Sequence, residues 1–223
     1  MANKAEHEGQ RAGVAEAQVA RVAAIGSAAH PHLAVLTTAT GAAASRDLSD
    51  AVHLLCAVHG SHPGLADLAH SASPAGAARD WLRDAADAFD RERLYLVRLT
   101  SAIGPTPSTP GSVQTENALL AQRHAIETLA KSERRGCALG AATALIQDWR
   151  GLRPLLDHAA HRSGVECPAC TLPDDESLAA AVAAGIDGVA SERALVFGAE
   201  QLLLQHRGLL DLMEARAGSR DPF

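Results

Sequence analysis

The chain has 223 residues, of which 47% are hydrophobic and 3% aromatic, and its formal net charge at pH 7 is −6. This length supports one sizeable core, so we predict a single helical domain over residues 1–223, with frayed tails at about 1–8 and 218–223. The negative charge argues against nucleic acid as a partner, because nucleic-acid sites need clustered Lys and Arg. No apolar run approaches a membrane span, and the polar start MANKAEHEGQ has no signal-peptide pattern, so we expect a cytoplasmic protein that binds no membrane.

Alanine and leucine are abundant, whereas the β-branched and aromatic residues that build strands are thin and scattered. Because Ala and Leu are strong helix formers, we predict an all-α fold. Ser73 and Pro74 begin one long helical segment and Gly104 ends it. In chain order we expect helices at 13–25, 46–59, 75–103, 115–149 and 175–216, with a break or kink at Gly151 and Pro154. Three long helices and several shorter ones predict an antiparallel bundle.

A glutamate interrupts the apolar face of each predicted long helix. Glu92, Glu133 and Glu192 each fall on a row of mostly apolar residues spaced three and four apart, and this spacing traces one face of a helix. Burying an unpaired carboxylate costs several kcal/mol, so each buried glutamate needs a compensating partner. Two hypotheses supply one.

The first hypothesis is an internal ionic network that sets the register of the helices. An arginine follows each glutamate, at Arg93, Arg134 and Arg193. Each arginine points about 100° round the helix from its glutamate, which suits a partner on a neighbouring helix better than the adjacent glutamate. Under this hypothesis the chain is a non-catalytic bundle that binds a small-molecule or protein partner and needs no cofactor.

The second hypothesis is a di-metal site, since inward carboxylates on facing helices hold metal ions in some bundles, with His completing the shell. The ligands predicted for it are Glu92, Glu133, Glu192, His53, His124 and Glu127. With Asp50 and His53 in DAVH, the chain resembles the architecture of ferritin-like di-metal carboxylate bundles, which implies iron or manganese and redox activity. That family's Glu-x-x-His motif is absent here, and HAIE places His124 and Glu127 in the reverse order.

The stretch HAAHRSGVECPAC contains a third candidate site. Its residues His158, His161, Cys167 and Cys170 follow a His-x2-His-x5-Cys-x2-Cys spacing. Two histidines one turn apart and two nearby thiolates can close a tetrahedral zinc site. The alternative is that the thiols are incidental loop residues and the histidines are solvated.

SERRGCALGAATALIQDW together with GSAAHPHLAVL resembles an uncharacterised family of small all-helical bacterial proteins. The resemblance covers much of the chain and implies no activity. The sequence contains no phosphate loop, dinucleotide fingerprint or supported Ser-His-Asp arrangement, so it does not decide whether the protein is an enzyme. Gly136 and Gly140 in GCALG allow close helix packing, and the small-residue helix faces predict a homodimer.

Overall fold

The computed structural model describes residues 2–220, and the side chains from residue 13 onward. Within this part, nine α-helices and one short 3-10 turn form the fold, no strand is present, and the predicted all-α class is confirmed. The helices are α1 Ala2–Ile25, α2 Pro31–Thr38, α3 Ala42–His59, α4 Leu65–Ala72, α5 Ala77–Ala102, α6 Ser112–Ala130, α7 Cys137–Ser163, α8 Asp175–Gly185 and α9 Val189–Arg220. The 3-10 turn η1 spans Ser27–Ala29.

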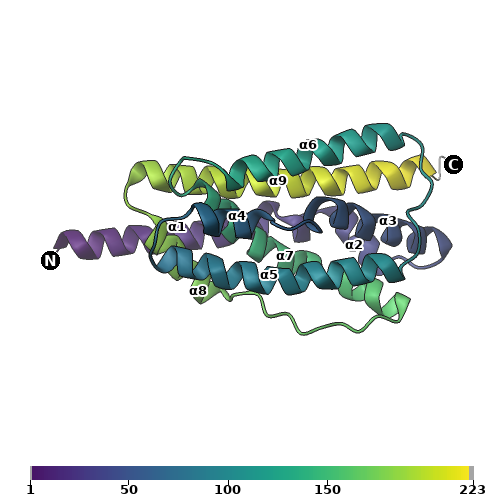
Figure 1. Cartoon of the computed structure of the whole chain (residues 1–223), viewed down its shortest axis with the longest axis horizontal. Helices are drawn as coiled ribbons and strands as arrows, with labels where there is room; N and C mark the ends of the chain where they lie inside the picture. The colour runs from purple at the N-terminus through teal and green to yellow at the C-terminus, as the bar shows by residue number, and fades with distance from the viewer. Residues whose placement is uncertain (1, 221–223) are drawn as a thin grey trace.

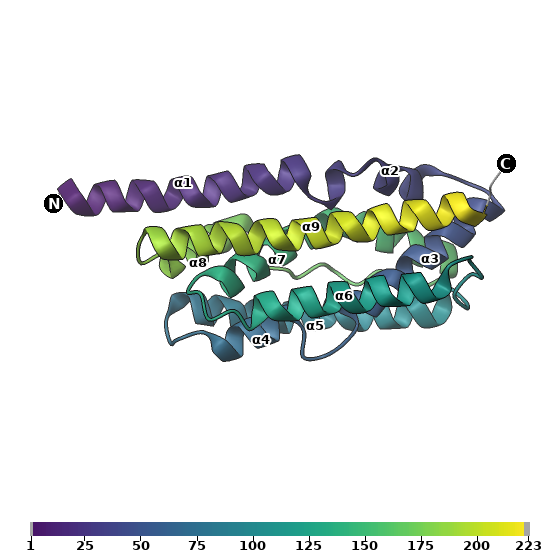
Figure 2. The same cartoon turned by 90° about the horizontal axis from the view of Figure 1, so that it is seen from above.

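The long helices run along one axis, and α7 lies at the centre of the bundle (Figures 1 and 2). It packs most extensively against α9 and also contacts α5, α6, α4 and α8. Trp149, Leu145 and Leu155 of α7 are fully buried because neighbouring helices surround this part of α7. The beginning of α1 extends past the end of the other helices (Figure 2).

The prediction of a single helix at 115–149 is wrong. The chain folds there into two helices, α6 and α7, which are separated by a turn at 131–136. The cause is Gly136, which takes a left-handed φ of 96° and begins α7. A side chain is disfavoured in this conformation, so Gly136 suits the turn. Glu133 therefore lies in an exposed turn and not on a helix face.

The last helix also divides, into α8 and α9, at a turn where Gly188 has a φ of 154°. Of the break or kink expected at Gly151 and Pro154, the break is wrong, because α7 is continuous from Cys137 to Ser163. Pro154 is exposed, while Arg153 and Leu155 on either side are buried, so packing holds the helix through the missing hydrogen bond.

Both expected tails are helical where the structure describes them. Residues 2–8 belong to α1, and residues 218–220 belong to α9, whose last residue Arg220 is ion-paired with α3. Residue 1 and residues 221–223 lie outside the described part of the chain.

Within residues 2–220, no single helix has the length and apolar character needed to cross a membrane. One pair of segments, Gly13–Ala29 and Pro31–Thr38, meets the criteria only when taken together, and the two are bent by 50° relative to each other.

Glycines bring the backbones of α7 and α9 into contact. A Cβ atom added at Gly140 would lie 2.0 Å from the Leu195 carbonyl oxygen, and one added at Gly198 would lie 2.0 Å from that of Cys137. The small-residue face predicted from GCALG is therefore used inside the chain, between α7 and α9.

We expect Gly140→Ala to lower the free energy of unfolding by roughly 1–3 kcal/mol, because the two backbones must move apart. Gly218→Ala on α9 is the matched control: a Cβ there meets no atom within 4 Å. Its higher helix propensity should stabilise the protein by up to about 1 kcal/mol. Urea denaturation measures both, and equal effects would contradict the close contact.

Candidate functional site

A buried ion pair joins α5 to α7. Glu92 is 2% exposed, and its Oε1 accepts a hydrogen bond from Arg153 Nη1 at 2.7 Å. Its Oε2 accepts a second from Trp149 Nε1 at 3.0 Å. Burial raises the pKa of Glu92 above its usual value, and the charge of Arg153 and the Trp149 hydrogen bond only partly offset this. The carboxylate is thus held by two donors from one helix.

Arg153 extends this cluster to the loop after α7. Its Nε donates to Asp157 at 2.8 Å, its Nη2 donates to the carbonyl oxygen of Pro168, and its guanidinium lies 4.7 Å from the centre of the Tyr95 ring. The Tyr95 hydroxyl lies 3.0 Å from Asp157 Oδ1 and 3.6 Å from Cys167 Sγ. Burial and these neighbours raise the pKa of Tyr95. Arg153 therefore holds the Cys-Pro-Ala-Cys loop against the bundle.

A second buried carboxylate, Asp148, joins α7 to η1 and α9. Ser27 donates to it from its backbone nitrogen at 2.7 Å and from its hydroxyl at 2.5 Å. His206 Nδ1 donates to Oδ2 at 2.6 Å. Burial by itself would raise the pKa of Asp148, but the hydrogen bonds and charge of His206 and the hydrogen bonds of Ser27 outweigh it and lower this pKa.

His206 in turn contacts a second buried histidine, His59, with ring centroids 5.0 Å apart and the rings perpendicular. Among the described side chains, neither His59 Nε2 nor His206 Nε2 has a hydrogen-bond partner. An unsatisfied buried polar group costs about 1–3 kcal/mol, so two adjacent ones in a core mark a candidate functional region.

A third ionic cluster joins the end of α9 to α3. Arg216 donates to both oxygens of Asp50, at 2.8 and 2.7 Å, and Arg220 donates to Asp50 at 2.7 Å and to Asp47 at 2.7 Å. Burial would raise the pKa of Asp50, but the two arginines lower it. Asp50 therefore pairs with arginines of α9, one turn from His53.

The residues predicted for a di-metal site are spread over the bundle. Glu133 is exposed in the α6–α7 turn, and Glu192 is half-buried in the first turn of α9. His53 Nε2 donates to the Gly104 carbonyl at 2.8 Å. His124 and Glu127 are exposed on α6, and Glu127 pairs with Lys131. Of this set, Glu92 is the residue whose carboxylate is buried in the core, and Arg153 and Trp149 bind it.

The structure brings together part of the predicted zinc set. Cys167 Sγ lies 3.9 Å from His161 Nδ1, and this nitrogen lies 2.6 Å from the Asp157 carbonyl oxygen. Cys170 is exposed, and His158 is half-buried on α7. In the part of the chain with described side chains, the groups of three ligand atoms within 4.8 Å of one another are elsewhere: His30, Asp211 and Glu214, and His62, Asp67 and Asp90.

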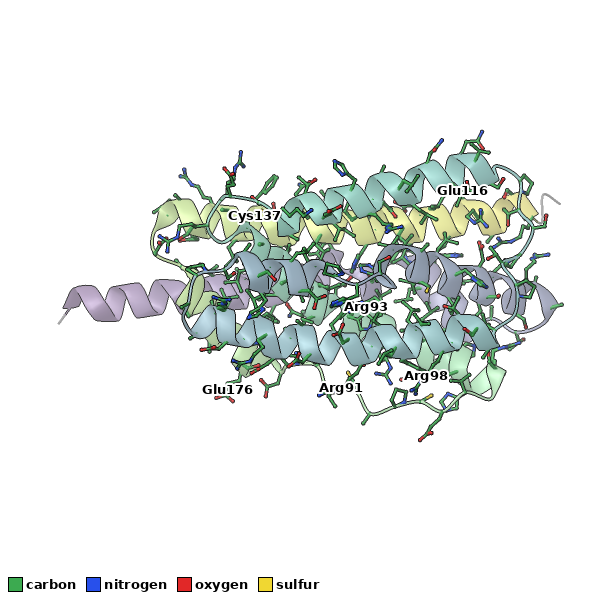
Figure 3. The ribbon with its side chains drawn as sticks, viewed as in Figure 1. Arg91, Arg93, Arg98, Glu116, Cys137 and Glu176 are labelled. Carbon is green, nitrogen blue, oxygen red and sulfur yellow. The ribbon has the colours of Figure 1, made fainter. Side chains whose placement is uncertain are left out.

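Arg93 occupies the second of those groups. It points from α5 toward the neighbouring helix (Figure 3), where its Nη2 lies 3.1 Å from Asp67 Oδ2, and it also pairs with Asp90. The prediction that this arginine reaches a neighbouring helix is confirmed. Its guanidinium already neutralises the carboxylates that a cation would need.

The residues that sequence analysis missed are the partners on α7. Asp148 and Arg153 are polar positions in the otherwise apolar run CALGAATALIQDWRGLRPLL, and both are buried. The signal that singled out Glu92, a charge on an apolar helix face, is also present at Asp148. Arg153 and Glu92 lie on different helices, 61 positions apart in the chain, and no pattern along the chain indicates their contact.

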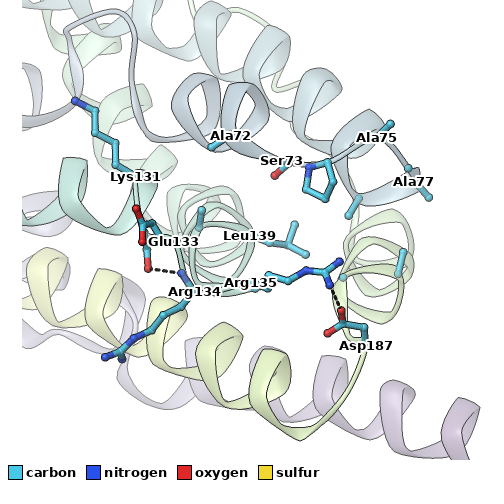
Figure 4. Close-up of a pocket in the computed structure, with 18 residues that line it drawn as sticks. Ala72, Ser73, Ala75, Ala77, Lys131, Glu133, Arg134, Arg135, Leu139 and Asp187 are labelled. Atoms are coloured by element: carbon cyan, nitrogen blue, oxygen red, sulfur yellow. Dashed lines mark hydrogen bonds and ion pairs between the residues drawn. The ribbon is translucent and has the colours of Figure 1, made fainter.

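A surface pocket of about 390 Å³ opens at one end of the bundle, and we call it the end pocket (Figure 4). Its walls are formed by residues 72–78, which run from the end of α4 into the first turn of α5, by the α6–α7 turn with the first residues of α7, and by the end of α8. Arg135 reaches across it to Asp187, with an N–O distance of 2.5 Å, while Arg134 and Lys131 lie at its edge (Figure 4). Glu133 is also at the edge.

Two helices begin at the end pocket. Gly76 precedes α5 and Gly136 precedes α7, and neither helix has a side-chain N-cap hydrogen bond. The first N–H groups of a helix lack partners within the helix and carry a partial positive charge, so both helix starts favour an anion. The stretch KSERRG thus supplies this pocket with three basic residues and with a helix start that has no side-chain cap, although the Cys137 N–H donates to the Arg134 carbonyl.

The fold and these sites define an all-α helical protein with buried ionic clusters and a basic pocket at one end. The chain belongs to a family of unknown function, DUF6975, whose model matches residues 22–221. The predicted resemblance to an uncharacterised family is confirmed. No curated protein and no solved structure shows significant similarity to the chain.

We expect Glu92→Ala to lower the free energy of unfolding by about 3–5 kcal/mol, because it leaves the buried Arg153 without one of its carboxylate partners. Glu133→Ala is the control, since Glu133 is exposed, and its effect should stay within about 0.5 kcal/mol. Urea denaturation measures both. Similar losses for the two variants would show that the ion pair is not what stabilises this region.

Glu92 also predicts a pH dependence. Its pKa in the folded protein is raised above the ordinary value of 4.5, so its contribution to stability is complete below that pH and is lost as the pH rises through the folded pKa. The difference in free energy of unfolding, wild type minus Glu92→Gln, should therefore fall as the pH rises above 4.5. Denaturation curves at a series of pH values measure it, and a difference that grows with pH would contradict the raised pKa.

Proposed function

We propose that this protein is a non-catalytic binding protein that holds the phosphate group of a small molecule in the end pocket. The observation that carries the proposal is the meeting, in one pocket, of Arg135 and two helix starts that lack side-chain caps, α5 and α7. Helix N-termini are anion sites because their N–H groups and dipoles point at the ligand, and arginine pairs with phosphate oxygens.

The ion pair between Arg135 and Asp187 leaves Arg135 able to bind a ligand. Their side chains are 73% and 49% exposed, and exposed pairs of this kind contribute at most about 1 kcal/mol. A phosphate can therefore take the place of the Asp187 carboxylate. The pocket, at about 390 Å³, has the size of a small-metabolite site.

Of the glutamates in the ionic network predicted from the sequence, Glu92 is buried and ion-paired, with Arg153, whereas Glu133 is exposed. Other buried carboxylates support a structural role for charge in the core. Glu92, Asp148 and Asp50 each accept hydrogen bonds from two or more donors in the core. Groups held in this way set the position of helices and favour a rigid binding scaffold over acid–base chemistry.

Location and assembly remain predictions from the sequence. A ligand with a phosphate group agrees with a cytoplasmic protein. The proposed homodimer would use faces other than Gly136 and Gly140, since α9 covers both positions.

Titration calorimetry with inorganic phosphate and with glycerol phosphate tests the proposal. Arg135→Ala should weaken binding about tenfold, the effect of losing one charge-assisted hydrogen bond. Asp187→Asn should strengthen binding, because it removes the competing carboxylate that pairs with Arg135. Binding unchanged in both variants would overturn the proposal.

A second pair of variants tests the helix starts. Ala77 is exposed in the first turn of α5, so Ala77→Asp places a carboxylate at the end pocket and should lower phosphate affinity. Ala42→Asp makes the same change in the first turn of α3, which also follows a glycine, and should leave affinity unchanged. Each aspartate should stabilise its helix by about 0.3–1 kcal/mol, so a stability change cannot explain a difference in binding.

A further inference from the structure

A second cavity, of about 520 Å³, opens where α5 ends and α6 begins, and we call it the loop pocket. The end pocket lies where α5 begins, so the two cavities are at opposite ends of the bundle (Figure 1). The second half of α3, the end of α5, the loop residues 106–109 and the start of α6 form its walls. Its apolar lining consists of Leu54, Ala57, Pro107 and Leu119. A cavity of this volume accommodates a small molecule.

Arg216 is the arginine of the loop pocket, and its charge is already neutralised. It is 6% exposed, and its Nε and Nη2 donate to the two carboxylate oxygens of Asp50 at 2.8 and 2.7 Å. Its Nη1 also donates to the Thr115 hydroxyl at 2.8 Å, and its Nη2 to the Thr109 hydroxyl at 3.1 Å. An anionic ligand has to displace Asp50 to bind this arginine, so the loop pocket is poorly suited to anions.

Glu116 is the carboxylate that lines the loop pocket. It lies exposed near the beginning of α6 (Figure 3), and no residue in the described part of the chain forms a hydrogen bond or an ion pair with it. The charge that this pocket leaves unneutralised is therefore negative. A negative charge in a cavity attracts a ligand that carries a positive one.

His53 supplies a second acceptor, from α3. Its Nε2 donates to the carbonyl oxygen of Gly104 at 2.8 Å, so in the neutral ring Nδ1 is the nitrogen that accepts a hydrogen bond. Nδ1 has no partner among the described residues. His53 is half-buried, and Nδ1 is not one of the buried atoms that lack a partner, so a ligand in the pocket can reach it.

Three hydroxyl groups complete the polar lining. Thr106, Ser108 and Ser112 are exposed, and their hydroxyls make no hydrogen bond with any other residue that the structure describes. Because a hydroxyl both donates and accepts, these groups can bind a polar ligand without adding a charge.

We propose that the loop pocket binds a small aliphatic amino alcohol, with its ammonium group at Glu116, its chain against the apolar lining and its hydroxyl at His53 Nδ1. The ammonium group pairs with the carboxylate that lacks a partner, and the hydroxyl donates to the neutral nitrogen. Leu119 lies one turn after Glu116 on α6, and Leu54 follows His53 on α3, so aliphatic side chains adjoin both polar groups. This site is independent of phosphate binding in the end pocket.

NMR titration of the full chain with three probes of similar length tests the assignment: 4-amino-1-butanol, pentylamine and 1-pentanol. Pentylamine replaces the hydroxyl by a methyl group, and 1-pentanol replaces the ammonium group by a methyl group. We expect 4-amino-1-butanol to bind about fivefold tighter than pentylamine, because of one net hydrogen bond, and about tenfold tighter than 1-pentanol, because of one charge-assisted hydrogen bond. Inorganic phosphate should not compete with it, which separates this site from the end pocket.

Two variants assign the ends of the ligand. Glu116→Gln should weaken the binding of both amines about tenfold and leave 1-pentanol unchanged. Glu127→Gln is the matched control, because Glu127 is an exposed glutamate of the same helix outside the loop pocket, and the same change of charge there should have no effect. His53→Phe should make 4-amino-1-butanol and pentylamine bind equally.

The proposal is overturned if the wild-type protein does not bind 4-amino-1-butanol, if pentylamine or 1-pentanol binds as tightly, or if Glu116→Gln and Glu127→Gln change the affinity equally. These outcomes do not depend on His53→Phe, so the test stands even where that variant fails to fold.

Discussion

Most of α7 is buried between neighbouring helices, and this burial determines where the other long helices lie. Polar residues on the buried faces of this helix cannot reach solvent, so each one needs a partner on a neighbouring element. Asp148 meets Ser27 of η1 and His206 of α9, and Arg153 meets Glu92 of α5. These two residues of α7 lie within about two turns, so they set the position of α5 and α9 along the same stretch of the central helix.

Two buried carboxylates, Asp148 of α7 and Glu92 of α5, have pKa values shifted in opposite directions. Asp148 is held ionised by His206 and Ser27, and its pKa is lowered, whereas burial raises the pKa of Glu92 despite Arg153. The difference follows from the balance between desolvation and the donors that each carboxylate receives. His59 adds a buried polar ring beside them, whose pKa burial lowers and whose Nε2 has no hydrogen-bond partner among the described residues.

Glycine shapes both the packing and the end pocket. Gly140 and Gly198 let α7 and α9 approach at backbone distance, and Gly136 turns the chain so that α7 begins beside the start of α5. Because Gly136 interrupts the helix, Glu133 lies in the turn between α6 and α7 and not on the face of one long helix. The same turn places Arg135 across the pocket.

Helix propensity and apolar spacing are local properties of a chain, so they predicted the all-α class, the approximate bounds of α5 and the burial of Glu92. It also indicated that Arg93 reaches a neighbouring helix, which the ion pair with Asp67 shows. The packing of the helices, by contrast, pairs Glu92 with Arg153 and Asp50 with Arg216, and it brings His59 and Arg123 to one cavity. The residues of the two ion pairs are 61 and 166 positions apart, and His59 and Arg123 are 64 apart, so each arrangement depends on how helices pack rather than on any pattern along the chain.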